Sequence, residues 1–152
     1  MELIKKIAQH SGSLYAVAYS EKLNLIFTGG ADKIIASWDP VTFENSPFSV
    51  KTNSAILNLN IINDNHLFVG LFNGNFHIID LSTRKELKYI TKHSKGIFSS
   101  CVTKNNQLVV GSGDGFISVW DTSNYSLLFE KQICEGKVRA MSAIENQVFI
   151  GD

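Results

Sequence analysis

Residues 28–39, Thr28-Gly-Gly-Ala-Asp-Lys-Ile-Ile-Ala-Ser-Trp-Asp39, carry the pattern that decides the fold, because this pattern returns at a fixed interval. Two later stretches align with it without gaps: Val69-Gly-Leu-Phe-Asn-Gly-Asn-Phe-His-Ile-Ile-Asp80 and Val110-Gly-Ser-Gly-Asp-Gly-Phe-Ile-Ser-Val-Trp-Asp121. The interval is 41 residues in every aligned column, and a fourth, partial copy runs from Lys137 to Gly151. A fixed interval of this length indicates a repeat architecture, in which each repeat is one supersecondary unit.

Within one interval the pattern is that of short β-strands. Residues 14–19, 25–28 and 34–38 are rich in β-branched and aromatic residues and are bounded by turn residues. Pro40 ends the third of these strands, and a fourth strand is expected around residues 48–50. No stretch keeps a 3.6-residue period, so no helix is expected. Four short antiparallel strands in about 40 residues are typical of a β-propeller blade, so the sequence predicts an all-β chain of propeller blades in an incomplete ring.

The residues at fixed places in these repeats resemble those of the WD-repeat (WD40) β-propeller family. Trp-Asp pairs end the third strand at residues 38–39 and 120–121, and a histidine precedes the first strand at His10 and His93. The turn between the second and third strands carries Asp32 and Asp114. The resemblance covers essentially the whole chain. It implies one hydrogen-bonded network per blade, joining the histidine, the aspartate, a hydroxyl on the second strand and the tryptophan.

The three repeats keep this network to different degrees. Blade one has all four members: His10, Thr28, Asp32 and Trp38. Blade three keeps His93, Asp114 and Trp120, whereas Val110 replaces the hydroxyl. Blade two has lost nearly every member, with Val69, Asn73 and Ile79 at the corresponding places. We therefore expect blade two to be held mainly by apolar packing.

The chain is interpreted as one partial propeller domain over residues 1–152. Its expected parts are an outer strand of a neighbouring blade at 3–8, blade one at 12–51, blade two at 53–92, blade three at 95–133, and the first two strands of a further blade at 137–152. The family resemblance implies a ring of ~28 strands in seven blades, about 13 more than this chain supplies. Three completions remain open: continuation of the same chain, another polypeptide, or a second copy. An uncovered last strand would be a template for aggregation or pairing.

Composition and charge exclude several classes of protein. The 152 residues are 44% hydrophobic and 18% charged, which excludes a disordered chain. Fourteen basic and fourteen acidic residues cancel, so we expect no nucleic-acid partner and no electrostatic docking on a membrane. The start lacks the apolar core of a signal peptide, and no apolar run is long enough to span a bilayer. With only Cys101 and Cys134, a reducing intracellular setting, the cytoplasm, is expected.

No catalytic, cofactor or metal site is predicted. His10 and Asp32 could form an acid–base pair, but the same pair returns as His93 and Asp114, and an active site is rarely duplicated in each repeat. His66 and His77 are isolated, and the cysteines and histidines show no metal-ligand spacing. The segment 111–115, Gly-Ser-Gly-Asp-Gly, is followed by a strand and not by a helix, so it predicts a turn and not a phosphate loop.

The resemblance also implies a binding face at the narrow end of the blades. Family members often grip partners with residues just inside the first strand and with the residue before the turn aspartate. The first set corresponds here to Tyr15, Leu57, Phe98 and Arg139, and the second to Ala31, Phe72 and Gly113. Two residues upstream of the first set are Ser13, Ala55, Gly96 and Lys137. Aromatic side chains and arginine are enriched at interface hot spots, although the aromatics could instead pack inward.

Two functions follow as alternatives. The first is a non-catalytic scaffold for protein–protein interaction that binds an unidentified protein or peptide through the narrow face. The second is a structural half-propeller that assembles with itself or another chain and has no peptide ligand.

Overall fold

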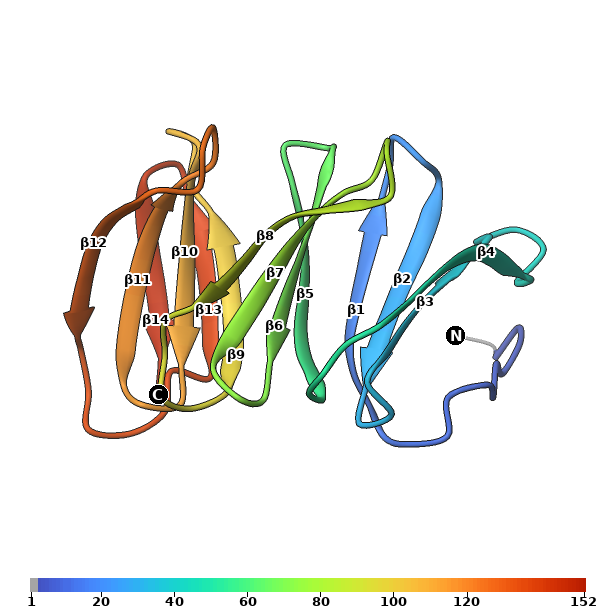
Figure 1. The fold of residues 1–152 in the computed structure, drawn as a ribbon, viewed down its shortest axis with the longest axis horizontal. Coiled ribbons are helices and arrows are strands. Elements are labelled where there is room, and N and C mark those ends of the chain that lie inside the picture. The colour runs from blue at the N-terminus through green and yellow to red at the C-terminus, as the bar shows by residue number, and fades with distance from the viewer. Residues whose placement is uncertain (1–2) are drawn as a thin grey trace.

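The computed structural model describes residues 3–152, which form fourteen β-strands in four antiparallel sheets and no helix (Figure 1). Blade one comprises β1 (Leu14–Ser20), β2 (Leu25–Gly30), β3 (Ile34–Trp38) and β4 (Asn45–Lys51). Blade two comprises β5 (Ile56–Ile62), β6 (His66–Leu71), β7 (Asn75–Asp80) and β8 (Lys85–Thr91). Blade three comprises β9 (Ile97–Val102), β10 (Gln107–Ser112), β11 (Phe116–Asp121) and β12 (Leu127–Gln132). The half-blade comprises β13 (Ala140–Ile144) and β14 (Gln147–Gly151).

The four sheets stand side by side in an open row that does not close into a ring (Figure 1). Within each sheet the strands follow chain order, so every connection is a short hairpin. The first strands β1, β5, β9 and β13 contact one another in sequence and form the common inner line of the row. This arrangement confirms the all-β, propeller-blade fold that the repeats predict.

A glycine on the second strand sets the distance between neighbouring blades. A Cβ atom added at Gly29 would lie 2.7 Å from Cγ2 of Ile56 in the next blade, and one at Gly70 would lie 2.7 Å from Cγ2 of Ile97. At Gly111 the corresponding distance to Val138 Cγ1 is 2.5 Å. At each of these three junctions a fully buried β-branched residue, in or just before the first strand, therefore packs against the bare backbone of the preceding blade.

The hydrophobic core lies between the sheets in two clusters. Between blades one and two, the rings of Phe27 and Phe48 meet edge to face at 5.4 Å. Between blades two and three, Phe76 of β7 meets Trp120 of β11 edge to face at 5.3 Å. Blade two contributes to both clusters, so apolar contacts hold it on each side.

Residues 3–8 pair with no strand in this structure. An outer strand needs the third strand of its own blade as a hydrogen-bonding partner, and none of the fourteen strands fills that place. The segment instead contacts the β3–β4 turn, where Lys5 Nζ donates to the carbonyl oxygen of Thr42 and lies 5.6 Å from the ring centroid of Phe43. Its expected role as an outer strand of a neighbouring blade stays a prediction.

Candidate functional site

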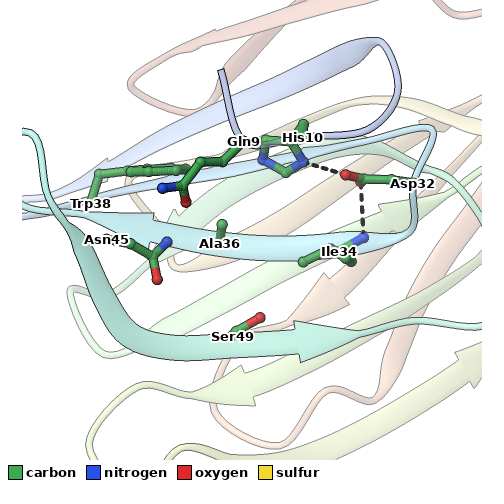
Figure 2. Close-up of a pocket in the computed structure, with 8 residues that line it drawn as sticks. All are labelled: Gln9, His10, Asp32, Ile34, Ala36, Trp38, Asn45 and Ser49. Atoms are coloured by element: carbon green, nitrogen blue, oxygen red, sulfur yellow. Dashed lines mark hydrogen bonds and ion pairs between the residues drawn. The ribbon is translucent and has the colours of Figure 1, made fainter. Parts of the chain in front are cut away.

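In blade one, four side chains form a continuous line of hydrogen bonds. Nδ1 of His10 lies 2.8 Å from Oδ2 of Asp32, and Nε2 of His10 lies 2.8 Å from Oγ1 of Thr28. Trp38 Nε1 donates to the same Thr28 oxygen at 2.7 Å. Figure 2 shows the His10 ring pointing at Asp32, which also accepts from the backbone N–H of Ile34 at 3.2 Å.

The donors and acceptors fix the direction of two of these bonds. The Trp38 N–H can only donate, so the Thr28 hydroxyl accepts from it, and the same hydroxyl lies 3.5 Å from the carbonyl oxygen of Ala36. Nδ1 of His10 carries the proton that the Asp32 carboxylate accepts. Burial, the largest single influence, raises the pKa of Asp32, but hydrogen bonds from His10 and the Ile34 N–H outweigh it, so the pKa lies below its usual value. Every member of the line thus has a hydrogen-bonding partner.

Blade three forms a similar line with a different hydroxyl. Trp120 Nε1 donates to Oγ of Ser118 at 2.8 Å, and Nε2 of His93 lies 2.8 Å from the same oxygen. The ring of His93 is buried, and its Nδ1 lies 3.4 Å from Oδ1 of Asp114. Sequence reasoning missed Ser118 because the family pattern expects the hydroxyl on the second strand, where Val110 stands. The strand pairing could have indicated Ser118, because this residue pairs directly with Val110 on the neighbouring strand.

In blade two a different polar cluster lies on the outer strands. His77, which pairs with Val69 across the ladder, lies with Nδ1 2.5 Å from Oε2 of Glu86. Its ring also stacks on Tyr89 at a centroid distance of 4.6 Å. The Tyr89 hydroxyl accepts hydrogen bonds from side-chain amides of Asn53 and Asn75. These contacts tie β7 to β8 on the surface and do not reproduce the network of the other blades.

The narrow face lies at the lower end of the strands in Figure 1, where the β2–β3, β6–β7 and β10–β11 turns gather. Here the first strand of each of the three full blades contains a β-bulge. In blade one the register jumps from Leu14 to Ala16, which leaves Tyr15 as the extra residue. The same irregularity leaves Leu57 unpaired in blade two and Phe98 in blade three. A bulge changes the direction of its extra side chain, so the same backbone irregularity sets the orientation of the side chain at all three positions.

In each full blade, one backbone hydrogen bond joins the expected turn residue to the residue two positions before the expected first-strand residue. The N–H of Ala31 donates to the carbonyl of Ser13, that of Phe72 to Ala55, and that of Gly113 to Gly96, each at 2.8 Å. The turn residue and the start of the first strand are therefore adjacent in all three blades. Tyr15 is 54% exposed and Phe72 is 63% exposed, so these two aromatics do not pack inward.

The structure gathers several of the expected residues around one cavity between blades two, three and the half-blade. The cavity has a volume of about 220 Å³ and is lined by Phe72, Ser94, Lys95, Gly96, Phe98, Gly113 and Lys137. Leu57 borders it, since a Cβ atom at Gly96 would lie 2.8 Å from Leu57 Cδ1. Arg139 reaches it through Phe98, with Cζ 5.9 Å from the ring centroid. Tyr15 and Ala31 belong to blade one and do not line this cavity.

Within residues 3–152, no group of three or more His, Cys, Asp or Glu side chains is placed to hold a metal ion. No helix of the described residues is long and apolar enough to cross a membrane.

Fold and site together define a repeat protein built from propeller blades. The sequence model described as "WD domain, G-beta repeat" matches residues 1–39 and 84–121, two segments that both end on a Trp-Asp pair. The chain belongs to this WD40 family, whose members are typical protein-interaction scaffolds and are generally non-catalytic. The segment between the two matches, residues 40–83, contains most of blade two, the repeat that lacks the network.

Individual relatives are distant and longer. The chain is 22% identical over 148 residues to protein tipD of Dictyostelium discoideum, covering 97% of this chain and 23% of tipD. It is 25% identical over 130 residues to the COMPASS component SWD3 of Saccharomyces cerevisiae, covering 78% of this chain and 41% of SWD3. The chain thus spans less than half the length of these curated relatives. The WD40 β-propeller domain of Doa1 superposes with a TM-score of 0.77 at 16% identity, over 90% of this chain and 47% of that one, which shows the fold alone.

Proposed function

We propose that this chain is a non-catalytic scaffold that holds a partner protein or peptide on its narrow face. The observation that carries the proposal is the set of first-strand bulges, which present Tyr15, Leu57 and Phe98 at the end where the turn residue Phe72 is exposed. Rigid strands hold these positions in place, so little ordering entropy opposes binding. Exposed aromatic side chains in fixed positions favour a binding role over a packing role.

The chemistry of the blades supports a scaffold and not an enzyme. Both His–Asp pairs lie inside the hydrogen-bonded lines that end at Trp38 and Trp120, where every polar partner is already engaged. Among the relatives, SWD3 is described as a component of COMPASS, which favours a protein partner here as well. We place the protein inside the cell, because Cys101 and Cys134 are both free thiols.

Quantitative affinity capture from lysate of the source cells tests the proposal. The triple variant Tyr15→Ala, Phe72→Ala, Phe98→Ala should lose the partners that the wild type retains, while its thermal unfolding changes little. Phe129→Ala is the matched control, because Phe129 is an exposed phenylalanine on the outer strand β12. If the triple variant retained the same partners as the wild type, the face would be wrongly assigned.

A second candidate function is a structural subunit that assembles with further blades. Leu14 stands where Ile56 and Ile97 stand in their blades, yet it is 46% exposed while they are fully buried. At the other end of the row, a Cβ atom at Gly151 would meet nothing closer than 3.9 Å, unlike the glycines that receive the next blade. One end of the row thus exposes the inserting residue, Leu14, and the other end exposes the receiving glycine, Gly151; together these are the two residues of a blade-to-blade contact. Ile144 and Phe149 add exposed apolar surface on the same β13–β14 hairpin.

Light scattering over a range of protein concentrations tests this second candidate. Assembly through the row ends predicts a mass above 16.9 kDa that returns to the monomer value in a Leu14→Asp variant. Val41→Asp, a change at an exposed residue of the β3–β4 turn, is the control. A wild type that stays at the monomer mass at every concentration would count against self-assembly.

A further inference from the structure

The cavity formed by Phe72, Ser94, Lys95, Gly96, Phe98, Gly113 and Lys137, here called the aromatic–basic cavity, carries a more specific inference. It rests on the proposed function, because it concerns the same face. We propose that this cavity takes an acidic peptide segment, with one apolar side chain between Phe72 and Phe98 and neighbouring carboxylates beside Lys95, Lys137 and Arg139.

The floor of the cavity is bare backbone. A Cβ atom at Gly113 would lie 2.8 Å from Cε2 of Phe98, and one at Gly96 would lie 3.1 Å from the carbonyl oxygen of Phe72. The two glycines therefore let the Phe98 ring and the Phe72 backbone pack closely against the cavity floor, where a side chain would clash with them. The cavity volume of about 220 Å³ suits one apolar side chain with part of its backbone, and it is too small for a folded element.

Cations surround this opening without counter-charges. Nζ of Lys137 lies 5.8 Å and Cζ of Arg139 lies 5.9 Å from the Phe98 ring centroid. Within residues 3–152, no carboxylate lies within ion-pair distance of Lys95, Lys137 or Arg139. Three cations on a chain of zero net charge are a local concentration of positive charge, which favours an anionic ligand.

The carboxylate next to the lining residue Gly113 does not neutralise them. Asp114 follows Gly113, but it accepts hydrogen bonds from the backbone N–H groups of Ser94 at 2.9 Å and Phe116 at 3.1 Å. It also faces His93 and is not part of the cavity lining. The Asp114 carboxylate therefore points toward the interior of the blade, while Lys95 and Lys137 lie on the surface.

The same observations favour a peptide over a nucleic acid. Nucleic-acid grooves track a phosphate backbone with a run of basic residues and offer aromatic rings for stacking of successive bases. Here the cations are confined to one cavity, and the Phe98 ring already contacts two of them. An acidic peptide with one apolar anchor matches both the size and the charge.

Selection from a random-sequence peptide library displayed on phage, with the wild-type chain as bait, tests the inference. Enriched peptides should combine aspartate or glutamate with one leucine, isoleucine or phenylalanine. Their affinity, measured by fluorescence polarisation, should fall about tenfold or more in the double variant Lys137→Glu, Arg139→Glu. The matched control is Lys88→Glu with Lys131→Glu, two exposed lysines on the outer strands β8 and β12. Repeating the selection with the reversed variant should enrich basic peptides.

Each other outcome overturns the inference, and the outcomes separate it from the proposed function. Enrichment of basic or uncharged peptides that still lose affinity in Phe98→Ala would overturn the acidic specificity and leave the binding face intact. Acidic peptides that bind Phe72→Ala and Phe98→Ala as well as the wild type would overturn both. Failure to enrich any peptide would overturn the inference alone, because the capture experiment tests the face independently. A poly-uridylate oligonucleotide that binds tightly and is lost in Phe98→Ala would replace the peptide with a nucleic acid.

Discussion

Thr28 in blade one and Ser118 in blade three supply equivalent hydroxyl groups from different strands of their blades, Thr28 from the second strand and Ser118 from the third. In blade one Thr28 is on β2, opposite Ala36 of β3, whereas in blade three Ser118 is on β11, opposite Val110 of β10. Each hydroxyl accepts from a tryptophan indole and lies 2.8 Å from Nε2 of a histidine. The hydroxyl therefore comes from opposite members of equivalent cross-strand pairs in the two blades, whereas the histidine and the tryptophan occupy equivalent positions.

This relationship predicts the outcome of exchanging the two residues in blade three. Ser118→Ala should destabilise the chain by about 1–3 kcal/mol, because the buried Trp120 N–H and His93 Nε2 both lose their partner. Adding Val110→Thr in the same chain should restore much of that loss by placing the hydroxyl where blade one has it. Urea unfolding measures both effects, with Ser123→Ala as an exposed control. A double variant no more stable than Ser118→Ala would contradict the exchange.

A second prediction concerns the close approach of blades two and three. Gly70→Ala should destabilise the chain by about 1–3 kcal/mol, because the new methyl group would lie 2.7 Å from Ile97 and push the blades apart. Gly136→Ala is the matched control, since a Cβ atom there meets nothing within 4 Å. Thermal unfolding of the two variants compares them directly, and equal midpoints would show that the glycines do not set the spacing.

A third prediction concerns pH. Burial lowers the pKa of His93 below its ordinary value of 6.5, more than the nearby Asp114 carboxylate raises it. Below pH 6.5 the unfolded chain therefore binds a proton that folded His93 does not, so the free energy of unfolding falls as the pH drops from 6.5. His93→Gln should remove this part of the slope, whatever it does to the overall stability. Urea unfolding at a series of pH values measures it, and parallel profiles for wild type and variant would disprove the assignment.

The aspartates of the two networks make the stability depend on pH in a lower pH range than His93 does. The pKa values of Asp32 and Asp114 lie below their ordinary value of 3.8, because hydrogen bonds to the carboxylates outweigh the opposing effect of burial. Their contribution to stability is present above pH 3.8 and is lost as the pH falls through the folded-state values. Asp114→Asn should flatten acid unfolding in this window, as followed by near-ultraviolet circular dichroism. An unchanged acid transition would place the responsible carboxylates elsewhere.

The sequence carried the repeat and the strand order, because period-two patterning and turn residues are local signals. It placed the third strand of blade one at Ile34–Trp38, where the structure has it. The second strand extends further than expected, to Gly30, because its last residues pair with Leu14 and Ala16 of β1, a contact that local pattern does not encode. Pro47 lies within β4 where the register shifts, which an edge strand tolerates.

The candidate site was only partly readable from sequence. The repeat columns pointed to Tyr15, Leu57 and Phe98, but the bulges that present them depend on pairing with the second strand and leave no local signature. The gathering of Lys137 and Arg139 around Phe98 is a contact between blades, which alignment within repeats cannot show. Ser118 was not predicted because its role depends on its pairing with Val110 across the strand ladder within blade three.

The most direct measurement of the binding role replaces Phe98 or Phe72 with a photo-reactive phenylalanine analogue. Irradiation with cellular partners present should then link the chain to its partner from these two positions, and mass spectrometry should locate the link. The same analogue at Phe129, an exposed phenylalanine on the outer strand β12, should give no such link. Efficient linkage from Phe129 together with none from Phe72 or Phe98 would contradict a partner held at the narrow face.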